Sequence, residues 1–267
     1  MALLTLSNIH KTFEKGTVNE NHVLCGLDLD IEQGDFISVI GGNGAGKSTL
    51  MNSIAGVVDI DEGDILLEGG SIRKASVAAR SKDISRVFQD PRMGTATNLT
   101  IEENMAIAYR RGKKRSFFKK SVTEQERELF KETLTELGLG LENRMKTDAA
   151  FLSGGQRQAL TLAMATLVRP KILLLDEHTA ALDPKTSDMV MHLTKKIVEE
   201  QELTTLMITH NMEHAIEYGN RLIMLYHGKI VVDVRGDEKK NLTVAQLMDL
   251  FHKNSGQALN DDALVLG

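Results

Sequence analysis

A glycine-rich segment in the first fifth of the chain carries the residue types that bind phosphate groups. It fits the pattern G-x-x-x-x-G-K-[ST] and consists of Gly41, Gly42, Asn43, Gly44, Ala45, Gly46, Lys47 and Ser48, followed by Thr49. Glycines allow the backbone to curl so that its N–H groups converge on phosphate oxygens, at the positive end of the following helix. Lys47 would reach the β- and γ-phosphates, and the Ser48 hydroxyl would ligate Mg²⁺. The segment therefore predicts a binding site for a nucleoside triphosphate.

Two acidic residues end a strongly apolar run in the second half of the chain. The aliphatic residues Ile172–Leu175 lead directly into Asp176 and Glu177. A buried strand would bring Asp176 beside the phosphate loop, where it can hold Mg²⁺ through water, and Glu177 is placed to polarise an attacking water as general base. A structural strand that ends in an acidic turn has the same pattern. The acid pair by itself therefore leaves both interpretations open.

A second candidate phosphate site precedes a helical run at residues 157–167. It consists of Leu152, Ser153, Gly154, Gly155 and Gln156. Serine and two glycines place bare backbone amides and a hydroxyl at a helix N-terminus, which suits an anion, although a well-capped surface helix has the same composition. With the first glycine-rich segment and the acid pair in this order, the chain resembles the ATP-binding cassette (ABC) ATPases, whose LSGGQ signature it carries unaltered. The resemblance implies ATP as the nucleotide and a head-to-tail dimer, in which ATP lies between one subunit's phosphate loop and the other's signature.

Smaller motifs follow in the order that this family shows. By resemblance, Gln89 after Phe88 belongs to a Q-loop that contacts Mg²⁺ and the attacking water, and Asp183 belongs to a D-loop that crosses the dimer interface. His210 resembles the switch histidine that contacts the γ-phosphate, and Phe13 resembles the aromatic residue that stacks on adenine. A core role for Phe13 and a plain strand-end role for His210 remain alternatives.

Two residues depart from the family pattern. The proline that usually follows the catalytic glutamate is His178 here, and the serine that usually begins the D-loop is Ala180. Neither change removes a group that touches nucleotide, so we expect an active ATPase, with His178 as a tolerated surface substitution. The run of residues 176–184 is similar to that of an importer branch whose members are paired with solute-binding proteins for aromatic amino acids.

The elements that must position these residues alternate between strand and helix. The patterns predict an α/β fold, with a P-loop (RecA-like) ATPase core, an antiparallel β subdomain and an inserted helical subdomain at about residues 91–167. We expect an ATPase domain over residues 1–235, then a C-terminal segment, residues 236–267, with one helix at Val244–Phe251 and a tail. Predicted strands are residues 3–9, 23–29, 35–40, 65–68, 84–88, 171–175, 204–209, 221–226 and 229–234. Predicted helices are residues 47–54, 100–109, 121–137, 184–201 and 212–218.

Composition limits the settings in which this chain acts. The 267 residues have a formal net charge of -5, which argues against bulk nucleic-acid binding. The single cysteine, Cys25, cannot form an internal disulfide, and no apolar run approaches the ~18 residues that cross a bilayer. We therefore expect a cytoplasmic protein that reaches the inner face of the membrane through a partner.

A basic segment at residues 110–120 carries seven positive side chains around Phe117 and Phe118. The patterns favour a solvated loop between two helices. Contact with a membrane-embedded partner or anionic lipid is an alternative, and nucleic-acid binding is a third.

Taken together, the motifs predict an ATP-hydrolysing subunit that energises an ABC transporter, favouring import of a small solute such as an amino acid. Its expected partners are a second copy of itself, transmembrane permease subunits and a solute-binding protein. A P-loop GTPase or kinase is disfavoured by the LSGGQ segment and by the lack of an N-K-x-D motif. An exporter motor and a non-transport ABC ATPase acting on ribosomes or DNA remain alternatives.

Overall fold

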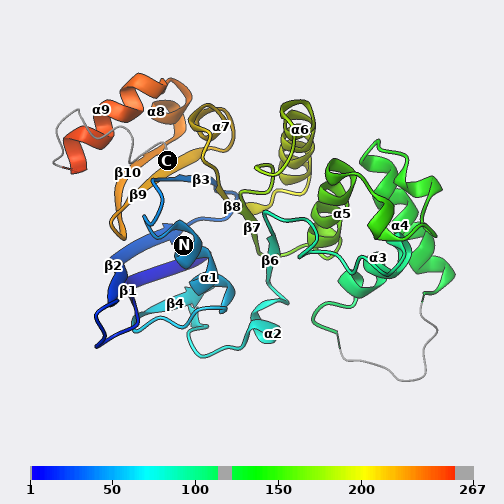
Figure 1. The fold of residues 1–267 in the computed structure, drawn as a ribbon, viewed down its shortest axis with the longest axis horizontal. Helices are drawn as coiled ribbons and strands as arrows, with labels where there is room; N and C mark the ends of the chain where they lie inside the picture. The colour runs from blue at the N-terminus through cyan, green and yellow to red at the C-terminus, as the bar shows by residue number, and fades with distance from the viewer. Residues whose placement is uncertain (1, 114–121, 256–267) are drawn as a thin grey trace. The chain divides into compact units, whose positions relative to one another are not determined.

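The computed structural model describes residues 2–113 and 122–255. It divides the chain into two compact units (Figure 1). Unit 1 comprises Met1–Arg80 and Thr204–Gly267, and unit 2 comprises Ser81–Leu203. The described helices that follow residue 235 belong to unit 1. The domain boundary that the sequence suggests at residue 235 stays a prediction.

One sheet of unit 1 is antiparallel. It has the order β2-β1-β4-β5, formed by Asn21–Ile31, Leu4–Phe13, Glu62–Leu67 and Gly70–Ser71. In the central strand β1, Leu6 lies opposite Leu29 of β2 and Ile65 of β4. All three side chains are buried, because alternate residues of a strand face the same side of the sheet. The predicted antiparallel β subdomain is confirmed.

A mixed group of strands in unit 1 surrounds β3 (Phe36–Ile40). This strand pairs in parallel with β8 (Thr204–Ile208) and β9 (Arg221–Tyr226), and β10 (Lys229–Arg235) returns antiparallel to β9. All residues of β3 and β8 are buried, including the polar residues Ser38, Thr204 and Thr205, because each strand has a neighbour on both sides or helices on its faces. Helix α1 (Lys47–Ala55) follows β3, α2 (Val77–Arg80) precedes unit 2, and α7 (Met212–Glu217) follows β8.

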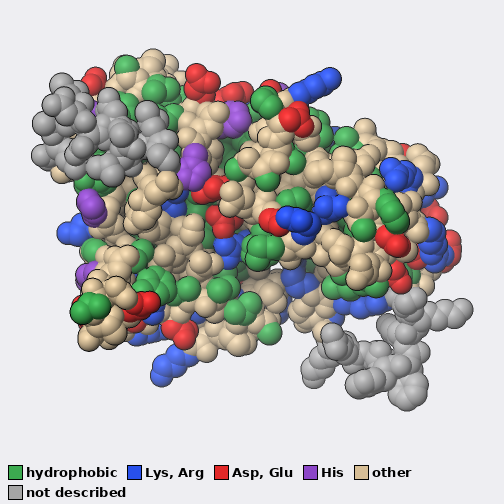
Figure 2. All heavy atoms as spheres, in the orientation of Figure 1, with side chains coloured by type: hydrophobic (Ala, Val, Ile, Leu, Met, Phe, Trp, Pro, Cys, Tyr) green, Lys and Arg blue, Asp and Glu red, His purple; other side chains and the backbone are tan. Residues whose placement is uncertain are grey.

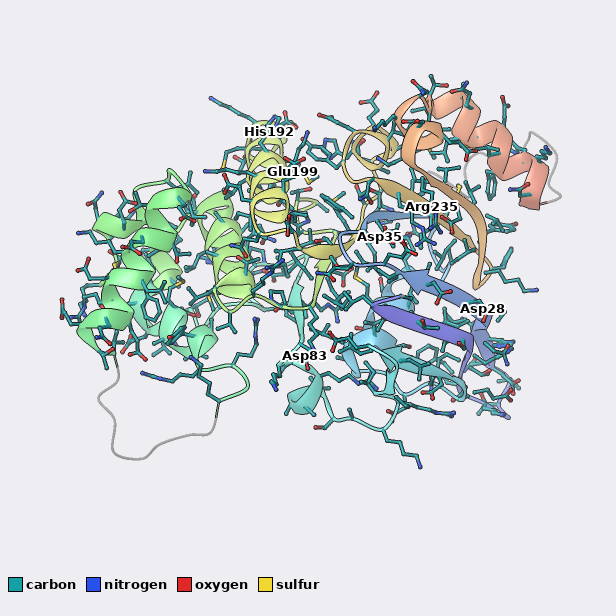
Figure 3. The ribbon with its side chains drawn as sticks, turned by 180° about the vertical axis from the view of Figure 1, so that it is seen from behind. Asp28, Asp35, Asp83, His192, Glu199 and Arg235 are labelled. Atoms are coloured by element: carbon teal, nitrogen blue, oxygen red, sulfur yellow. The ribbon has the colours of Figure 1, made fainter. Side chains whose placement is uncertain are left out.

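A buried arginine fixes the ends of these strands. Arg221, at the start of β9, is 2% exposed and binds Asp233 of β10 through Nη2 at 2.6 Å. Its Nη1 lies 3.2 Å from the carboxylate of Asp35, which directly precedes β3 and is labelled in Figure 3. One guanidinium therefore ties the strand that leads into the glycine-rich segment to the C-terminal hairpin.

The C-terminal segment contains two helices among its described residues, where the sequence predicts one. Helix α8 (Gly236–Lys240) precedes α9 (Val244–Ser255). Because α8 has only five residues, it is too short to show a helical period. In α9, Leu247 and Phe251 are fully buried in one cluster with Met224 and Val232 of the β9–β10 hairpin.

Helix α8 is anchored by a buried lysine. Lys239 is 2% exposed, and its Nζ donates to the backbone carbonyls of Ile216, Tyr218 and Gly219 at 2.6, 2.8 and 2.9 Å. Burial lowers the pKa of the Lys239 amine from its ordinary value to about 8. The three carbonyls favour the charged ammonium, but the loss of hydration outweighs them.

Unit 2 contains two strands, and all the other regular elements among its described residues are helical. Strands β6 (Ile84–Val87) and β7 (Ile172–Asp176) are parallel. The helices are α3 (Ile101–Tyr109), α4 (Glu124–Glu136), α5 (Gly154–Thr166) and α6 (Pro184–Glu200), with 3₁₀ helices η1 (Leu141–Asn143) and η2 (Ala149–Phe151). Thr100 and Thr123 begin α3 and α4 with capping boxes. On the face shown in Figure 2, acidic and basic side chains are interspersed over these helices.

The basic segment is only partly described. Lys114, Arg115, Phe117, Phe118, Lys119 and Lys120 lie outside the described residues. Of the rest, Arg110 pairs with Glu126 at 3.4 Å, whereas Arg111 donates from Nη2 to the carbonyls of Ala165 and Val168, at 3.2 and 2.6 Å. Burial also lowers the pKa of the Arg111 guanidinium. The prediction of a solvated loop is therefore wrong for Arg111, which binds the C-terminal end of α5.

No helix within residues 2–113 or 122–255 combines the length and the apolar character that a membrane span requires.

The buried amine of Lys239 gives a pH-dependent prediction. Between about pH 8 and the ordinary lysine pKa, the unfolded chain keeps a proton that the folded chain has released, so the unfolding free energy rises with pH. The unfolding free energy of wild type minus that of Lys239→Met should therefore rise through this window, by up to about 1.4 kcal/mol per pH unit. Urea denaturation at pH 7.5, 8.5 and 9.5 measures it. A flat difference would contradict the assignment, and Lys253→Met, at a mostly exposed end of α9, provides the control.

Candidate nucleotide-binding site

The turn from β3 into α1 has a backbone that only glycine tolerates well. Gly41 has φ 149° and Gly46, the N-cap of α1, has φ 102°. A Cβ on Gly41 would lie 2.3 Å from the carbonyl oxygen of Leu225, and one on Gly46 would lie 2.9 Å from that of Val23. The loop also closes on itself, with the Ala45 N–H donating to Gly42 at 3.2 Å. The glycines are thus required by the close approach of β9 and β2.

The same turn concentrates positive charge on an open helix end. Lys47 is 6% exposed, and its Nζ donates to the carbonyls of Gly41 and Gly42 at 2.6 and 3.1 Å. No side chain caps the start of α1, and no acidic residue lies in its first turn. Ser48 is exposed beside it. A lysine curled over its own loop and an uncapped helix N-terminus form a cradle that fits the phosphates of ATP.

Two further predicted residues belong to unit 1. His210 is exposed and comes two residues after the end of β8, where Thr209 N–H donates to Val39 of β3 at 3.2 Å. Because β3 and β8 are parallel, their carboxyl ends lie at the same edge of the sheet. His210 follows the end of β8, and the glycine-rich turn follows the end of β3, so both lie at this edge. Phe13 ends β1 and is 36% exposed, with Lys11 Nζ 5.4 Å from its ring centroid. Phe13 is therefore exposed, whereas the alternative interpretation was a residue buried in the core.

The acid pair lies at the end of β7 in unit 2. Ile172–Leu175 are completely buried, and Asp176 forms an ion pair with Arg86 of the neighbouring strand β6. Glu177 follows with φ 47°, a left-handed conformation that costs of order 1–3 kcal/mol in a non-glycine residue. A carboxylate oxygen is the ligand type that Mg²⁺ prefers, and Asp176 already holds a cationic group. Asp176 therefore offers one oxygen ligand of the type that Mg²⁺ prefers, and Arg86 neutralises it in this structure.

Sequence reasoning missed Arg86. The signal was present, because Arg86 is the only charged residue in the predicted strand at residues 84–88. A charge inside a strand that pairs with a buried strand needs a partner.

The LSGGQ segment begins α5 with a complete capping box. Ser153 Oγ accepts from Gln156 N–H at 3.2 Å, and Gln156 Oε1 accepts from Ser153 N–H at 3.3 Å. The Ser153 hydroxyl hydrogen is still available to a phosphate oxygen, since accepting a bond does not use it. Ser153 and Gly154 are exposed, whereas Gly155 is buried against α6, where a Cβ would lie 2.3 Å from Thr186 Cγ2. Gly155 thus has a packing role that the motif alone does not reveal.

The remaining predicted residues surround these elements in unit 2. Asp183 caps α6 by accepting from Thr186 N–H at 3.1 Å. The side chain and backbone N–H of Thr186 lower the pKa of the Asp183 carboxyl. Gln89 is exposed, next to Phe88, whose carbonyl accepts from Gln158 of α5 at 3.3 Å.

His178 is not at the surface, as the sequence led us to expect. It is 2% exposed, and its Nε2 lies 3.0 Å from Thr194 Oγ1 on α6. Because the Thr194 hydroxyl donates to the carbonyl of Val190 at 2.8 Å, Nε2 is the donor to Thr194. The residue after Glu177 is therefore a buried link to α6.

The predicted residues fall into two sets. The glycine-rich segment, Phe13 and His210 belong to unit 1. Gln89, residues 153–156, Asp176, Glu177 and Asp183 belong to unit 2. Each unit brings its own set to the ends of strands and helices.

Comparisons with known proteins agree with this geometry. A family model described as ABC transporter matches residues 24–180, more than half of the chain. The chain is 45% identical to the tyrosine transport ATP-binding protein of Clostridioides difficile, over 93% of this chain and 98% of that protein. It is 34% identical to the phosphonates import ATP-binding protein PhnC of Lactobacillus johnsonii, over 98% and 100% of the two chains. A solved dimeric ATP-binding cassette in a post-hydrolysis state, bound to ADP and Pi, matches with a TM-score of 0.74 and 29% identity, over 87% of this chain and 98% of its own.

A phosphate cradle between a buried strand and a helix, in an α/β fold with an antiparallel sheet, defines a P-loop nucleotide-binding protein. The chain belongs to the ABC transporter family, in which it is an ATP-binding and ATP-hydrolysing subunit. The expected ABC fold class and the expected ATPase activity are confirmed.

The contact between Gly155 and Thr186 gives a stability prediction. Gly155→Ala should lower the unfolding free energy by about 1–3 kcal/mol, because the new methyl group overpacks against Thr186 Cγ2. Thr186→Ser removes that methyl and keeps the hydroxyl, so the double variant should recover most of the loss. Urea denaturation of the four proteins gives the coupling energy. Additive losses would show that Gly155 is required for another reason, and Gly154→Ala, whose Cβ would lie 3.2 Å from a flexible Leu182 side chain, is the milder control.

Proposed function

We propose that this chain is the ATP-hydrolysing subunit of an importer for an aromatic amino acid such as tyrosine. The observation that carries the proposal is the 45% identity to the tyrosine transport ATP-binding protein over nearly the full length of both chains. Relatives named for phosphonate and methionine import are 33–35% identical. The gap of about ten percentage points supports the substrate in the name of the first relative over those of the others.

Within this proposal the two sets of site residues have distinct roles. Residues 41–49 bind the phosphates of ATP, and Phe13 stacks on adenine. The LSGGQ residues 153–156 of one copy approach the ATP held by the other copy, with Asp183 at the interface. Glu177 draws a proton from the attacking water, while Gln89 and His210 orient that water and the γ-phosphate.

A metal ion belongs to the same proposal. Ser48, Gln89 and Asp176 would hold Mg²⁺, which neutralises charge on the phosphates of the bound nucleotide. Asp176 supports this role, because its carboxylate already pairs with a cation at the end of a buried strand.

The assembly follows from the two helix N-termini. Helix α1 has the exposed Ser48 in its first turn, and α5 has the exposed Ser153 as its N-cap. One ATP in one copy does not need two such ends. A head-to-tail dimer gives each ATP one of each, and the related cassette bound to ADP and Pi is a dimer. The complete system would add transmembrane permease subunits and a solute-binding protein, with this chain on the inner face of the membrane.

Glu177→Gln should abolish turnover while ATP binding persists. The amide cannot accept the proton of the attacking water, so the rate should fall on the order of 10²- to 10⁴-fold. ATP that is bound but not hydrolysed should hold a dimer, which size-exclusion chromatography with ATP detects. Glu202→Gln is a matched control, since Glu202 is exposed and also has a left-handed backbone, with φ 48°. Normal turnover by Glu177→Gln would place the general base elsewhere.

The substrate is tested by uptake. Cells that lack this chain should lose ATP-dependent accumulation of radiolabelled tyrosine, and wild type should restore it, whereas Glu177→Gln should not. Unlabelled phenylalanine and tryptophan should compete for uptake, and methionine and a phosphonate should not. Unchanged tyrosine uptake with a loss of methionine or phosphonate uptake would reassign the substrate. No change in any uptake, together with recovery of the chain on ribosomes or DNA, would favour the non-transport alternative.

A further inference from the structure

Arg86 and Asp176 meet because of the register between two parallel strands. Arg86 of β6 lies opposite Leu174 of β7, so Asp176, two residues further along, projects from the same face of the sheet. The side chains are each 14% exposed and form an ion pair through Nη2 and Oδ2. Asp83, labelled in Figure 3, holds this register: its carbonyl accepts from the N–H of Lys171 at 2.7 Å, and its carboxylate pairs with Lys171 Nζ at 3.2 Å.

The ion pair affects what Asp176 can bind. A carboxylate that is mostly removed from water needs a compensating positive charge, and Arg86 supplies it. A second cation on the same carboxylate would be repelled by the guanidinium, because like charges a few ångströms apart interact strongly at a partly buried position. Arg86 and Mg²⁺ are therefore competitors for Asp176.

The Arg86 guanidinium also has a second contact. Its Cζ lies 4.8 Å from the ring centroid of Phe88, a cation–π arrangement. Phe88 directly precedes Gln89, and its carbonyl accepts from Nε2 of Gln158, a fully buried residue of α5. Helix α5 in turn begins at the capped Ser153. Three contacts within unit 2, Asp176–Arg86, Arg86–Phe88 and Phe88–Gln158, thus connect Asp176 to the residue before Gln89 and to the LSGGQ helix.

We propose that Arg86 is a resident counter-cation of Asp176, which releases this carboxylate to Mg²⁺ and keeps its contact with the Phe88 ring. Arg86 is a positioning residue: it keeps Asp176 neutralised when no metal is bound, and it links metal binding to the backbone at Phe88–Gln89. This inference rests on the proposed role of Asp176 as a metal ligand.

The test measures metal dependence in a background that does not hydrolyse ATP. In Glu177→Gln protein saturated with ATP, the melting temperature is recorded from EDTA through rising Mg²⁺, which gives the Mg²⁺ concentration of the half-maximal shift. Arg86→Gln should lower this concentration several-fold, because the competing charge is gone. It should also melt at a lower temperature than its parent when ATP and metal are both absent.

Two further variants make the result specific. Arg86→Lys keeps the positive charge but lacks the planar guanidinium group that matches a carboxylate. The Mg²⁺ concentration of its half-maximal shift should therefore fall between those of Arg86→Gln and the parent. Arg127→Gln breaks a comparable ion pair in the same unit, with Glu102 at 3.0 Å, and should leave the concentration unchanged. An unchanged or raised concentration in Arg86→Gln would overturn the proposal, and if that variant does not fold, Arg86→Lys decides in the same way.

Hydrogen exchange tests the second half of the proposal. Addition of Mg²⁺ to the ATP-saturated parent should change amide exchange over residues 87–90, and Arg86→Gln should lose that change. An equal change in both proteins would overturn the link to Gln89.

Asp176→Asn separates this inference from the proposed function. It should remove the Mg²⁺-dependent melting shift. A full shift in Asp176→Asn would show that Asp176 is not a metal ligand, so that the proposed site fails. Loss of the shift in Asp176→Asn, with Arg86→Gln identical to its parent, would overturn the inference about Arg86 alone.

Discussion

The turn between β3 and α1 imposes the constraint on which the rest of unit 1 depends. Its backbone must adopt positive φ at Gly41 and Gly46. The carbonyls of Leu225 and Val23 also lie so close to these two glycines that a Cβ there would collide with them. Such a turn keeps its conformation only if the strands around it are fixed. The buried strand β3, its parallel neighbours β8 and β9, and the Arg221 ion pairs provide that rigidity. The positive end of α1 and the side chain of Lys47, which lies over its own loop, then form the cradle that fits phosphate groups.

The two helix ends of the candidate site are built differently, which suits different tasks. Helix α1 begins without a capping side chain, so no side chain competes with a ligand for the N–H groups of its first turn. Helix α5 begins with a capping box from Ser153 and Gln156, so it is stable without a ligand. An end that is already stable can be presented at a surface and meet a ligand carried by another molecule.

Buried polar side chains join the end of β7 in unit 2 to the helices of the same unit. Arg86 neutralises Asp176, His178 donates to Thr194, and Gln158 donates to the carbonyl of Phe88. Each of these bonds has a cost if it is broken, because the groups are shielded from water. These bonds connect the residues around Glu177 to α5 and α6, and the surrounding structure holds the strained backbone of Glu177.

The sequence by itself determined the longer strands and helices and the order of the motifs, but not the short elements β5, α2 and α8. Glycine spacing, apolar runs and capping residues are local signals, so β3, α1, β7 and the start of α5 lie within a few residues of their predicted positions. Only the tertiary structure decided which side chains are buried and what they contact. His178 and Arg111 were predicted at the surface and are buried or part-buried, since Thr194 and the carbonyl of Val168, which bind them, are remote in sequence. The pairing of Arg86 with Asp176 depends on the β6–β7 register across 90 residues, and a pattern read along one strand does not contain that register.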